Sequence, residues 1–200
     1  MVGQIKPIGE VTSELLKDVD FYNNSEGGVT FSGGEPLMFP EYLLELVQQL
    51  KRENIHINIE TSGQFDFDRV EPLLPFFDMI FYDLKLMDNN KHKKYIGVDN
   101  KTILNNFKRL NQVFNNIQVR IPLIPTVNDD AENIEATCKF LLESGHQTVH
   151  LLPYHSMGNS KARRIDFNQE IFKVEPHSKN QIELIKSKFS KFGIKAITYD

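Results

Sequence analysis

The sequence predicts an α/β fold with a parallel sheet, and two observations carry this prediction. Short runs rich in β-forming residues alternate along the chain with longer segments whose apolar residues recur three and four positions apart. The length of 200 residues and the hydrophobic content of 40% are those of one ordinary domain, so a single domain over residues 1–200 is expected. Such alternation requires parallel strands joined by right-handed helical crossovers, as in an open doubly wound sheet or a complete or partial (β/α) barrel.

Each expected element follows from its residue pattern. The strands are expected at Val29–Gly33, Ile55–Glu60, Asp78–Asp83, Ile117–Pro122, Thr148–Pro153 and Ile194–Tyr199. The helical segments between them are expected at residues 41–54, 66–77, 101–114, 131–145 and 178–193. A further helix at Thr12–Tyr22, capped by Thr12 or Ser13, opens the chain, and no strand is expected before it. Residues Asn159–Ser178 are expected to form a long surface excursion.

Composition limits the partners and the compartment. The formal net charge of -4 provides no broad cationic field, so neither nucleic acid nor an anionic membrane is an expected partner. No apolar stretch reaches the roughly 20 residues that cross a bilayer, and the N-terminal residues lack the apolar core of a signal peptide. We therefore expect a cytoplasmic protein.

Polar residues gather where the expected strands end. These ends carry Ser32-Gly33-Gly34-Glu35, Glu60-Thr61-Ser62-Gly63, Asp83-Leu84-Lys85, Arg120 and His155. In parallel α/β folds this edge is where ligands bind, because the loops diverge there and the N-termini of the following helices point toward it. One ligand could therefore contact all five segments.

The Gly33-Gly34-Glu35 segment is suited to binding an ammonium group. Glycine lacks a Cβ, so a ligand can approach the main chain, and Glu35 adds a carboxylate while Pro36 stiffens the chain behind it. The alternative is an ordinary glycine turn that ends a strand beside an exposed glutamate.

The other polar residues at strand ends have comparable alternatives. Asp83 and Lys85 share a face if the strand continues to Lys85, where they would hold a zwitterion or form a salt bridge with each other. Arg120 lies in an otherwise apolar run, where a guanidinium is costly unless it meets an anion from a ligand or a neighbouring acid. His155 could hydrogen-bond a hydroxyl or be a satisfied loop histidine. The remaining histidines show no metal-ligand spacing and are expected on the surface or in the core.

The ordered set of these segments resembles a known family. The stretches GGVTFSGGEPLMFPEYLLELVQQLKRENIHINIETSG, FYDLKLMD, NKTILNNFKRL, VRIPLIPTVNDDAENI and LLPYHSMGNSK are similar to those of radical S-adenosylmethionine (SAM) enzymes that activate glycyl-radical enzymes, the pyruvate formate-lyase activating enzyme family. The resemblance runs from about Thr12 to the C-terminus, in the same order and with similar gaps. Residues 16–37 further resemble the subgroup that carries a ferredoxin-like insert before the helix expected here at Thr12–Tyr22.

The resemblance implies a partial (β/α) barrel of radical SAM type. It implies that Gly33, Gly34 and Glu35 hold the methionine ammonium group of SAM, and that Asp83, Lys85, Arg120 and His155 surround its carboxylate, ribose or adenine. Glu60-Thr61 matches an Asp-Thr pair proposed to bind a monovalent cation, and the glutamate is one methylene longer than the aspartate of that pair. The implied partners are a glycyl-radical enzyme, such as pyruvate formate-lyase, and a reductant such as flavodoxin or ferredoxin.

The sequence departs from the family at the metal cluster. The family binds a four-iron four-sulfur cluster through a CxxxCxxC loop after the first barrel strand, whereas the one cysteine here is Cys138, in a helical pattern and expected to be buried. The sequence is therefore expected to be a barrel missing its first strand and cluster loop, a fragment or degenerate relative that does not cleave SAM by itself.

Two other functions are open. One is a cluster-less module that binds SAM or docks the partner without chemistry. The other is a (β/α) barrel lyase or isomerase that uses Lys85 as a Schiff-base amine, with Asp83 or His155 as a proton shuttle. Trapping of a carbonyl substrate on Lys85 by borohydride would favour the second.

Overall fold

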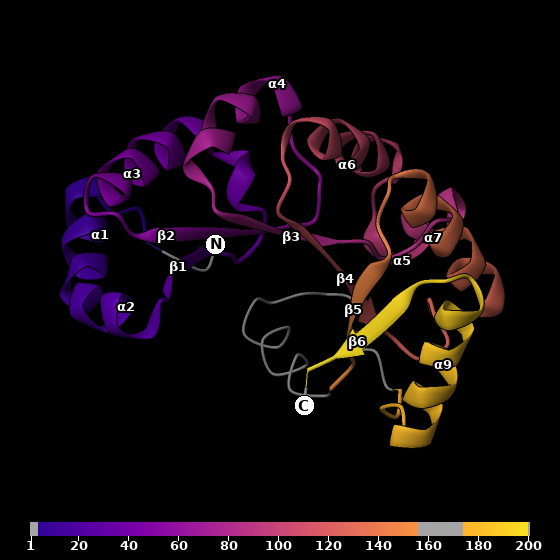
Figure 1. The fold of residues 1–200 in the computed structure, drawn as a ribbon. Helices are drawn as coiled ribbons and strands as arrows, with labels where there is room; N and C mark the ends of the chain where they lie inside the picture. Colours follow the sequence, from indigo (N-terminus) through magenta and orange to yellow (C-terminus); the bar gives the residue numbers. More distant parts are fainter. Residues whose placement is uncertain (1–3, 156–173, 200) are drawn as a thin grey trace. The chain divides into compact units, whose positions relative to one another are not determined.

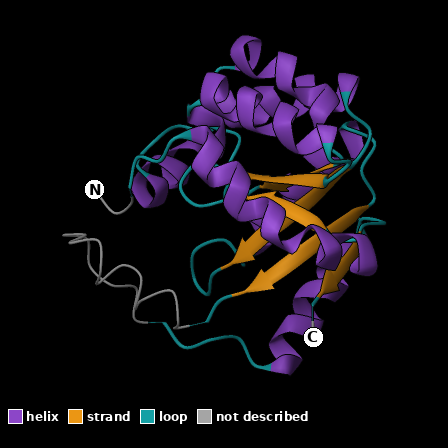
Figure 2. Ribbon diagram, turned by 90° about the vertical axis from the view of Figure 1, so that its left-hand side faces the viewer, coloured by secondary structure: helices purple, strands orange, loops and turns teal. Residues whose placement is uncertain are grey.

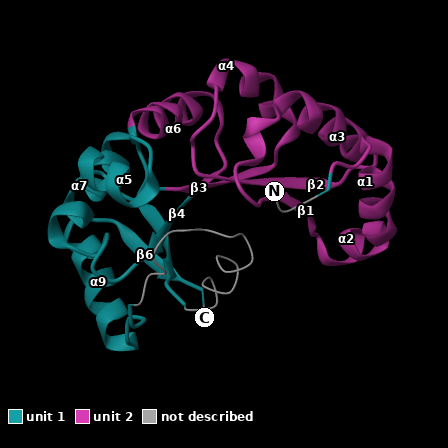
Figure 3. Ribbon diagram, turned by 180° about the vertical axis from the view of Figure 1, so that it is seen from behind, with its two compact units in different colours: residues 1–4, 84–100, 119–200 teal, residues 5–83, 101–118 magenta. Residues whose placement is uncertain are grey.

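The computed structural model describes residues 4–155 and 174–199 and confirms a parallel α/β fold. The six strands follow one another in the order β1-β2-β3-β4-β5-β6, and every pairing whose register is known is parallel. The chain divides into two compact units (Figure 3): unit 2 contains residues 5–83 and 101–118, and unit 1 contains residues 1–4, 84–100 and 119–200. That the chain forms a single domain stays a prediction.

Unit 2 is built on strands β1 (Gly28–Phe31), β2 (His56–Thr61) and β3 (Met79–Asp83). Gly28 pairs with His56, and Asn58 pairs with Met79. Figure 1 shows helices on one side of these strands. The helical segments of this unit are α1 (Ile8–Leu15), η1 (Leu16–Asp18), α2 (Val19–Ser25), η2 (Pro36–Met38), α3 (Pro40–Arg52), α4 (Phe67–Val70), η3 (Glu71–Phe76) and α6 (Lys101–Val113).

Helix α3 illustrates why these segments fold as they do. Its buried residues Leu43, Leu46, Val47 and Leu50 recur with helical spacing and form one apolar stripe. Pro40 occupies the first helical turn, where the missing N–H costs nothing. The stripe belongs to the same apolar core as β2, whose inward residues are fully buried.

Unit 1 is built on strands β4 (Ile117–Leu123), β5 (Thr148–Pro153) and β6 (Lys195–Thr198). Arg120 pairs with His150, and Val149 pairs with Ala196. The helices in the described part of this unit are α5 (Asn89–Ile96), α7 (Ala131–Glu143) and α9 (Lys179–Lys191). Figure 2 shows strands in orange with helices packed against them. No described helix is long and apolar enough to span a membrane.

The N-terminal helix differs from its prediction. It begins at Ile8 rather than Thr12 and is interrupted by η1, so neither Thr12 nor Ser13 is its cap. Pro7 is the N-cap residue, and its carbonyl accepts the amides of Glu10 and Val11. Thr12 is 8% exposed, and its hydroxyl donates to Gln49 Oε1 at 2.8 Å, so its side chain links α1 to α3 instead.

Other predicted elements also changed. The helix expected at residues 66–77 is one turn of α4 followed by the 3₁₀ segment η3, because Pro72 and Pro75 remove the amides that an α-helix needs. Helix α5 was not expected, since its sequence lacks an apolar stripe. Both ends of α5 nevertheless have typical capping residues. The Asp88 side chain accepts the amide of Lys91 at 2.6 Å at the N-terminus, and Gly97 ends the helix with φ +90°. Of the surface excursion expected at Asn159–Ser178, residues 159–173 lie outside the described part, and Ser178 caps α9.

Asp78, just before β3, makes the stability of unit 2 sensitive to acid. Its carboxylate accepts the amide of Ile57 at 2.6 Å and pairs with the ammonium of Lys51. Burial raises the pKa of Asp78, but the Lys51 and Ile57 hydrogen bonds and the Lys51 charge outweigh it, so the pKa lies below its usual value. A carboxyl group with a lowered folded-state pKa stabilises the fold above its unfolded pKa of about 3.9, and this contribution disappears as the pH falls through the folded value.

We expect Asp78→Asn to remove part of this acid sensitivity. Urea unfolding followed by circular dichroism at pH 6 and again near pH 3 should show a smaller loss of stability for the variant than for the wild type. Asp20→Asn, at an exposed position, is the control and should behave like the wild type. If the wild type and Asp78→Asn lose the same stability between pH 6 and pH 3, Asp78 is not a source of the acid sensitivity.

Candidate functional site

In unit 2 the loops after β1 and β2 meet at one edge. The strands are parallel and in register, so their carboxyl ends lie on the same side of the sheet. Asp83, the last residue of β3, belongs to this edge as well. The structure thus places Gly33, Gly34, Glu35 and Asp83 on one edge of one unit.

The main chain at Gly33 and Gly34 is accessible to a ligand. Gly33 has φ +120°, a conformation that other residues rarely adopt, and both glycines are exposed. A Cβ built on either residue would have no neighbouring atom within 4 Å. A ligand can therefore reach the backbone of this loop.

The carboxylate of Glu35 holds the two loops together. Its Oε1 accepts the hydroxyl of Thr61 at 2.8 Å and the amide of Leu37 at 3.3 Å. Its Oε2 accepts both the amide and the hydroxyl of Ser62, at 2.8 and 2.7 Å. Two of the four donors are hydroxyl groups, which can rotate toward other acceptors. Glu35 is thus fixed in place yet able to receive a cation.

Further contacts complete this edge of unit 2. Ser32 donates its hydroxyl to Glu60 Oε2 at 2.8 Å, which brings a second carboxylate to the loops. The hydroxyl oxygen of Thr61 accepts the amide of Gly63 at 3.0 Å. Two carboxylates on one edge create a negative potential that favours a cationic group.

Unit 1 contains the other three predicted residues. Lys85 lies in the loop after β3, Arg120 lies within β4, and His155 is exposed two residues after the end of β5. Arg120 was expected at a strand end, but β4 continues to Leu123, so Arg120 is in mid-strand. It faces His150 on β5, and the pKa of His150 is lowered first by burial and then by the Arg120 charge.

The salt bridge considered between Asp83 and Lys85 is not formed. Strand β3 ends at Asp83, and the Lys85 ammonium makes no hydrogen bond or ion pair with any of residues 4–155 and 174–199. Lys85 is only partly buried. Its charge is therefore available to a ligand. That the residues of the two units meet one ligand stays a prediction.

Four buried asparagines near these loops were missed by sequence reasoning. Asn106 donates to the carbonyls of Gly63 and Phe65 at 2.9 and 2.8 Å and so holds the loop after β2. Asn100, Asn128 and Asn133 hold the loop after β3. All four are at most 6% exposed. An asparagine in a loop or on a helix usually faces solvent, so the residue type alone did not reveal them.

The chain offers no cluster site in its described part. No three His, Cys, Asp or Glu residues among 4–155 and 174–199 are placed to hold a metal ion. Cys138 is fully buried in α7, as expected, and burial, followed by the charge of Glu135, raises the pKa of its thiol to about 11. One buried neutral thiol does not fit a cluster that needs three thiolates.

Three of the other histidines contact groups of the protein itself. His92 is 2% exposed, and its Nδ1 lies 2.7 Å from the carbonyl oxygen of Val98. His177 Nε2 lies 2.9 Å from Asp129 Oδ2. His150 stacks on Tyr199 with ring centroids 5.1 Å apart.

Comparison with known proteins identifies the family of the chain. The family model described as the Radical SAM superfamily matches residues 4–141. The chain is 37% identical over 201 residues to the (2S)-3-sulfopropanediol dehydratase activating enzyme of Klebsiella oxytoca, covering 98% of this chain and 63% of that protein. It is 37% identical over 200 residues to the trans-4-hydroxy-L-proline dehydratase activating enzyme of Clostridioides difficile, covering 98% of this chain and 66% of that protein. The chain thus spans slightly less than two thirds of these relatives.

A solved structure has the same fold. A domain of a pyruvate-formate lyase-activating enzyme from Bacteroides vulgatus superposes with a TM-score of 0.72 at 29% identity, covering 87% of this chain and 99% of that one. The fold class predicted from the alternation of strands and helices is confirmed.

Proposed function

Since this chain belongs to the radical SAM superfamily, we propose that it is the SAM-binding barrel portion of an enzyme that activates a glycyl-radical enzyme. The observation that carries the proposal is the edge of unit 2, where the Glu35 carboxylate is held by hydrogen bonds next to the accessible main chain of Gly33 and Gly34. The names of the two relatives described above, both activating enzymes, point the same way.

The residues of this chain would divide the recognition of SAM among themselves. Glu35 and the main chain of Gly33 and Gly34 would bind the methionine ammonium group, which takes the place of a rotating hydroxyl at the carboxylate. Asp83, Lys85, Arg120 and His155 would surround the carboxylate, ribose and adenine. The ammonium of Lys85 and the guanidinium of Arg120 would supply the positive charge that a carboxylate needs.

SAM would supply, after one-electron reduction, a 5′-deoxyadenosyl radical that removes hydrogen from a glycine of the partner. The residues of this chain do not fit the iron–sulfur cluster that delivers the electron, so their proposed part is to bind and orient SAM. The partner is proposed to be a glycyl-radical enzyme, with flavodoxin or ferredoxin as reductant.

Titration of SAM into the protein tests this proposal at Glu35. We expect Glu35→Gln to weaken SAM binding by roughly 10- to 100-fold, because a hydrogen bond to a charged group contributes about 1.5–3 kcal/mol. Isothermal calorimetry on the folded variant measures this directly. Glu45→Gln, on the exposed face of α3, is the matched control and should bind SAM as the wild type does. Affinity within twofold of wild type in Glu35→Gln would contradict the role of Glu35.

The single buried cysteine favours a second candidate, a module that binds SAM without cleaving it. The two candidates share the SAM site, and they differ in whether SAM is cleaved. Formation of 5′-deoxyadenosine in a preparation supplied with iron, sulfide and a low-potential reductant would exclude the module, whereas SAM binding without this product is expected of both candidates.

A further inference from the structure

The loop Leu84–Asp88, which carries Lys85, is held by side chains rather than by regular structure. Asn128 Nδ2 donates to the carbonyl of Lys85 at 2.9 Å, and Asn133 Oδ1 accepts the amide of Met87 at 2.9 Å. Asn100 Nδ2 donates to the carbonyls of Leu86 and Met87 at 3.0 and 2.7 Å. Three consecutive residues of the loop are therefore fixed by buried asparagine amides.

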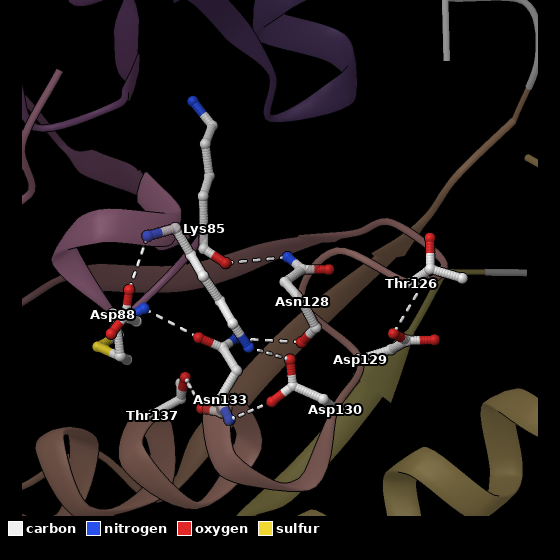
Figure 4. Close-up of polar contacts among 10 residues, drawn as sticks. Lys85, Asp88, Thr126, Asn128, Asp129, Asp130, Asn133 and Thr137 are labelled. Atoms are coloured by element: carbon white, nitrogen blue, oxygen red, sulfur yellow. Dashed lines mark hydrogen bonds and ion pairs between the residues drawn. The ribbon is translucent and has the colours of Figure 1, made fainter. Parts of the chain in front are cut away.

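Asn128 occupies the centre of this network (Figure 4). Besides Lys85, its Nδ2 donates to the carbonyl of Pro122 at 2.8 Å, and its Oδ1 accepts the amide of Ile124 at 2.8 Å. Its own carbonyl accepts Asn133 Nδ2 at 3.0 Å. The side chain is 2% exposed. One planar amide thus joins the end of β4 to the loop after β3.

No similar side chain could replace this amide. Two donors and one acceptor are used at once, so aspartate, which accepts only, would face two carbonyl oxygens without a proton to share. An apolar residue would leave the carbonyls of Lys85 and Pro122 unpaired in a buried place.

The anchored main chain matters most at Lys85, because it sets the direction in which the Lys85 side chain leaves the loop. Figure 4 shows the side chain directed away from Asn128 and Asn133, on the other side of the main chain. Its ammonium has no partner in the described part of the chain that would orient it. A lysine side chain has a flexible four-carbon stem, so the anchoring of its main chain is what limits the space that the charge can reach.

We propose that Asn128 is a positioning residue for SAM binding, because its amide fixes the main chain at Lys85 and thereby directs the Lys85 ammonium to the ligand. The inference rests on the proposed function, in which Lys85 contacts SAM. Asn128 itself need not touch SAM.

A double-mutant cycle between Asn128 and Lys85 tests the proposal. SAM affinity is measured by calorimetry for the wild type, Asn128→Asp, Lys85→Met and the double variant. We expect Asn128→Asp to weaken SAM binding about tenfold in the wild-type background and less than about twofold when Lys85 is already methionine. The ratio of these factors, about fivefold or more, corresponds to about 1 kcal/mol of coupling. Equal factors in the two backgrounds would overturn the proposal.

Two controls separate positioning from general destabilisation. Leu141→Ala truncates a fully buried apolar side chain of α7 in the same unit and removes no hydrogen bond of the network, so it should lower stability and leave SAM affinity unchanged. Hydrogen exchange at residues 84–88, measured by mass spectrometry, should accelerate in Asn128→Asp and stay unchanged in Leu141→Ala. A loss of affinity in Leu141→Ala as large as in Asn128→Asp would also overturn the proposal.

Two further outcomes have defined meanings. If Asn128→Asp fails to fold, Asn128→Ser, which carries a single donor on a shorter side chain, enters the cycle instead. If the wild-type protein binds no SAM, the proposed function of this chain fails and the inference fails with it. If the wild type binds SAM and the cycle shows no coupling, only the inference fails.

Discussion

Replacing Gly63 with alanine is expected to destabilise unit 2 by more than about 4 kcal/mol, the range reserved for substitutions that break a specific constraint. Gly63 has φ +82°, so any side chain there is strained. A Cβ at this position would lie 2.0 Å from the hydroxyl oxygen and 2.5 Å from Cζ of Tyr82. Tyr82 is completely buried and cannot move aside. Urea unfolding followed by circular dichroism measures the loss.

Two comparison variants identify the cause. Gly9→Ala lies in helix α1 with no atom within 4 Å of the new methyl group, and it should be neutral or stabilise the protein by about 0.5–1 kcal/mol. Tyr82→Phe removes the nearest atom, so the double variant with Gly63→Ala should recover part of the stability. The backbone strain at φ +82° would remain. A Gly63→Ala protein as stable as Gly9→Ala would refute the steric explanation.

Truncating Phe107 to alanine is expected to cost about 3–5 kcal/mol, as for other fully buried aromatic residues. Phe107 on α6 is 0% exposed, and its ring meets Tyr82 edge to face with centroids 5.1 Å apart. Removing the ring opens a cavity and removes this aromatic contact. Chemical denaturation gives the change in the free energy of unfolding.

Val113, at the end of the same helix, provides the control for Phe107. It is 55% exposed, so Val113→Ala should change stability by no more than about 0.5 kcal/mol. If Phe107→Ala and Val113→Ala unfold at the same urea concentration, the described packing of α6 on β3 is wrong.

Much of the fold could be predicted from the sequence because period-two and helical patterns reflect burial directly. All six strands lie within two residues of their predicted limits, and helices α3, α6, α7 and α9 match theirs closely. The failures occurred where burial gives no signal. Helix α5 has polar residues throughout most of its length, and the start of α1 depends on Pro7 rather than on a side-chain cap.

The candidate site was only partly visible in the sequence. Ligands of parallel α/β folds bind at the carboxyl ends of the strands, so Gly33, Glu35 and Lys85 could be selected from their positions in the sequence. The sequence did not reveal that Thr61 and Ser62 both donate to Glu35, because a hydroxyl has many possible acceptors. The asparagines that hold the loops were missed for the same reason: which carbonyl an amide meets depends on how distant segments pack.

The burial of Tyr82 gives this protein a built-in optical probe. The sequence has no tryptophan and six tyrosines, so tyrosine dominates its near-ultraviolet spectrum. The phenol of Tyr82 is fixed by its hydrogen bond to the carbonyl of Ile103 at 2.6 Å, and its pKa is raised well above the usual value, first by burial and then by the negative charge of Glu35. A cation that docks on Glu35 therefore changes the electric field at a rigid chromophore, and the circular dichroism of that band registers the docking without any attached dye.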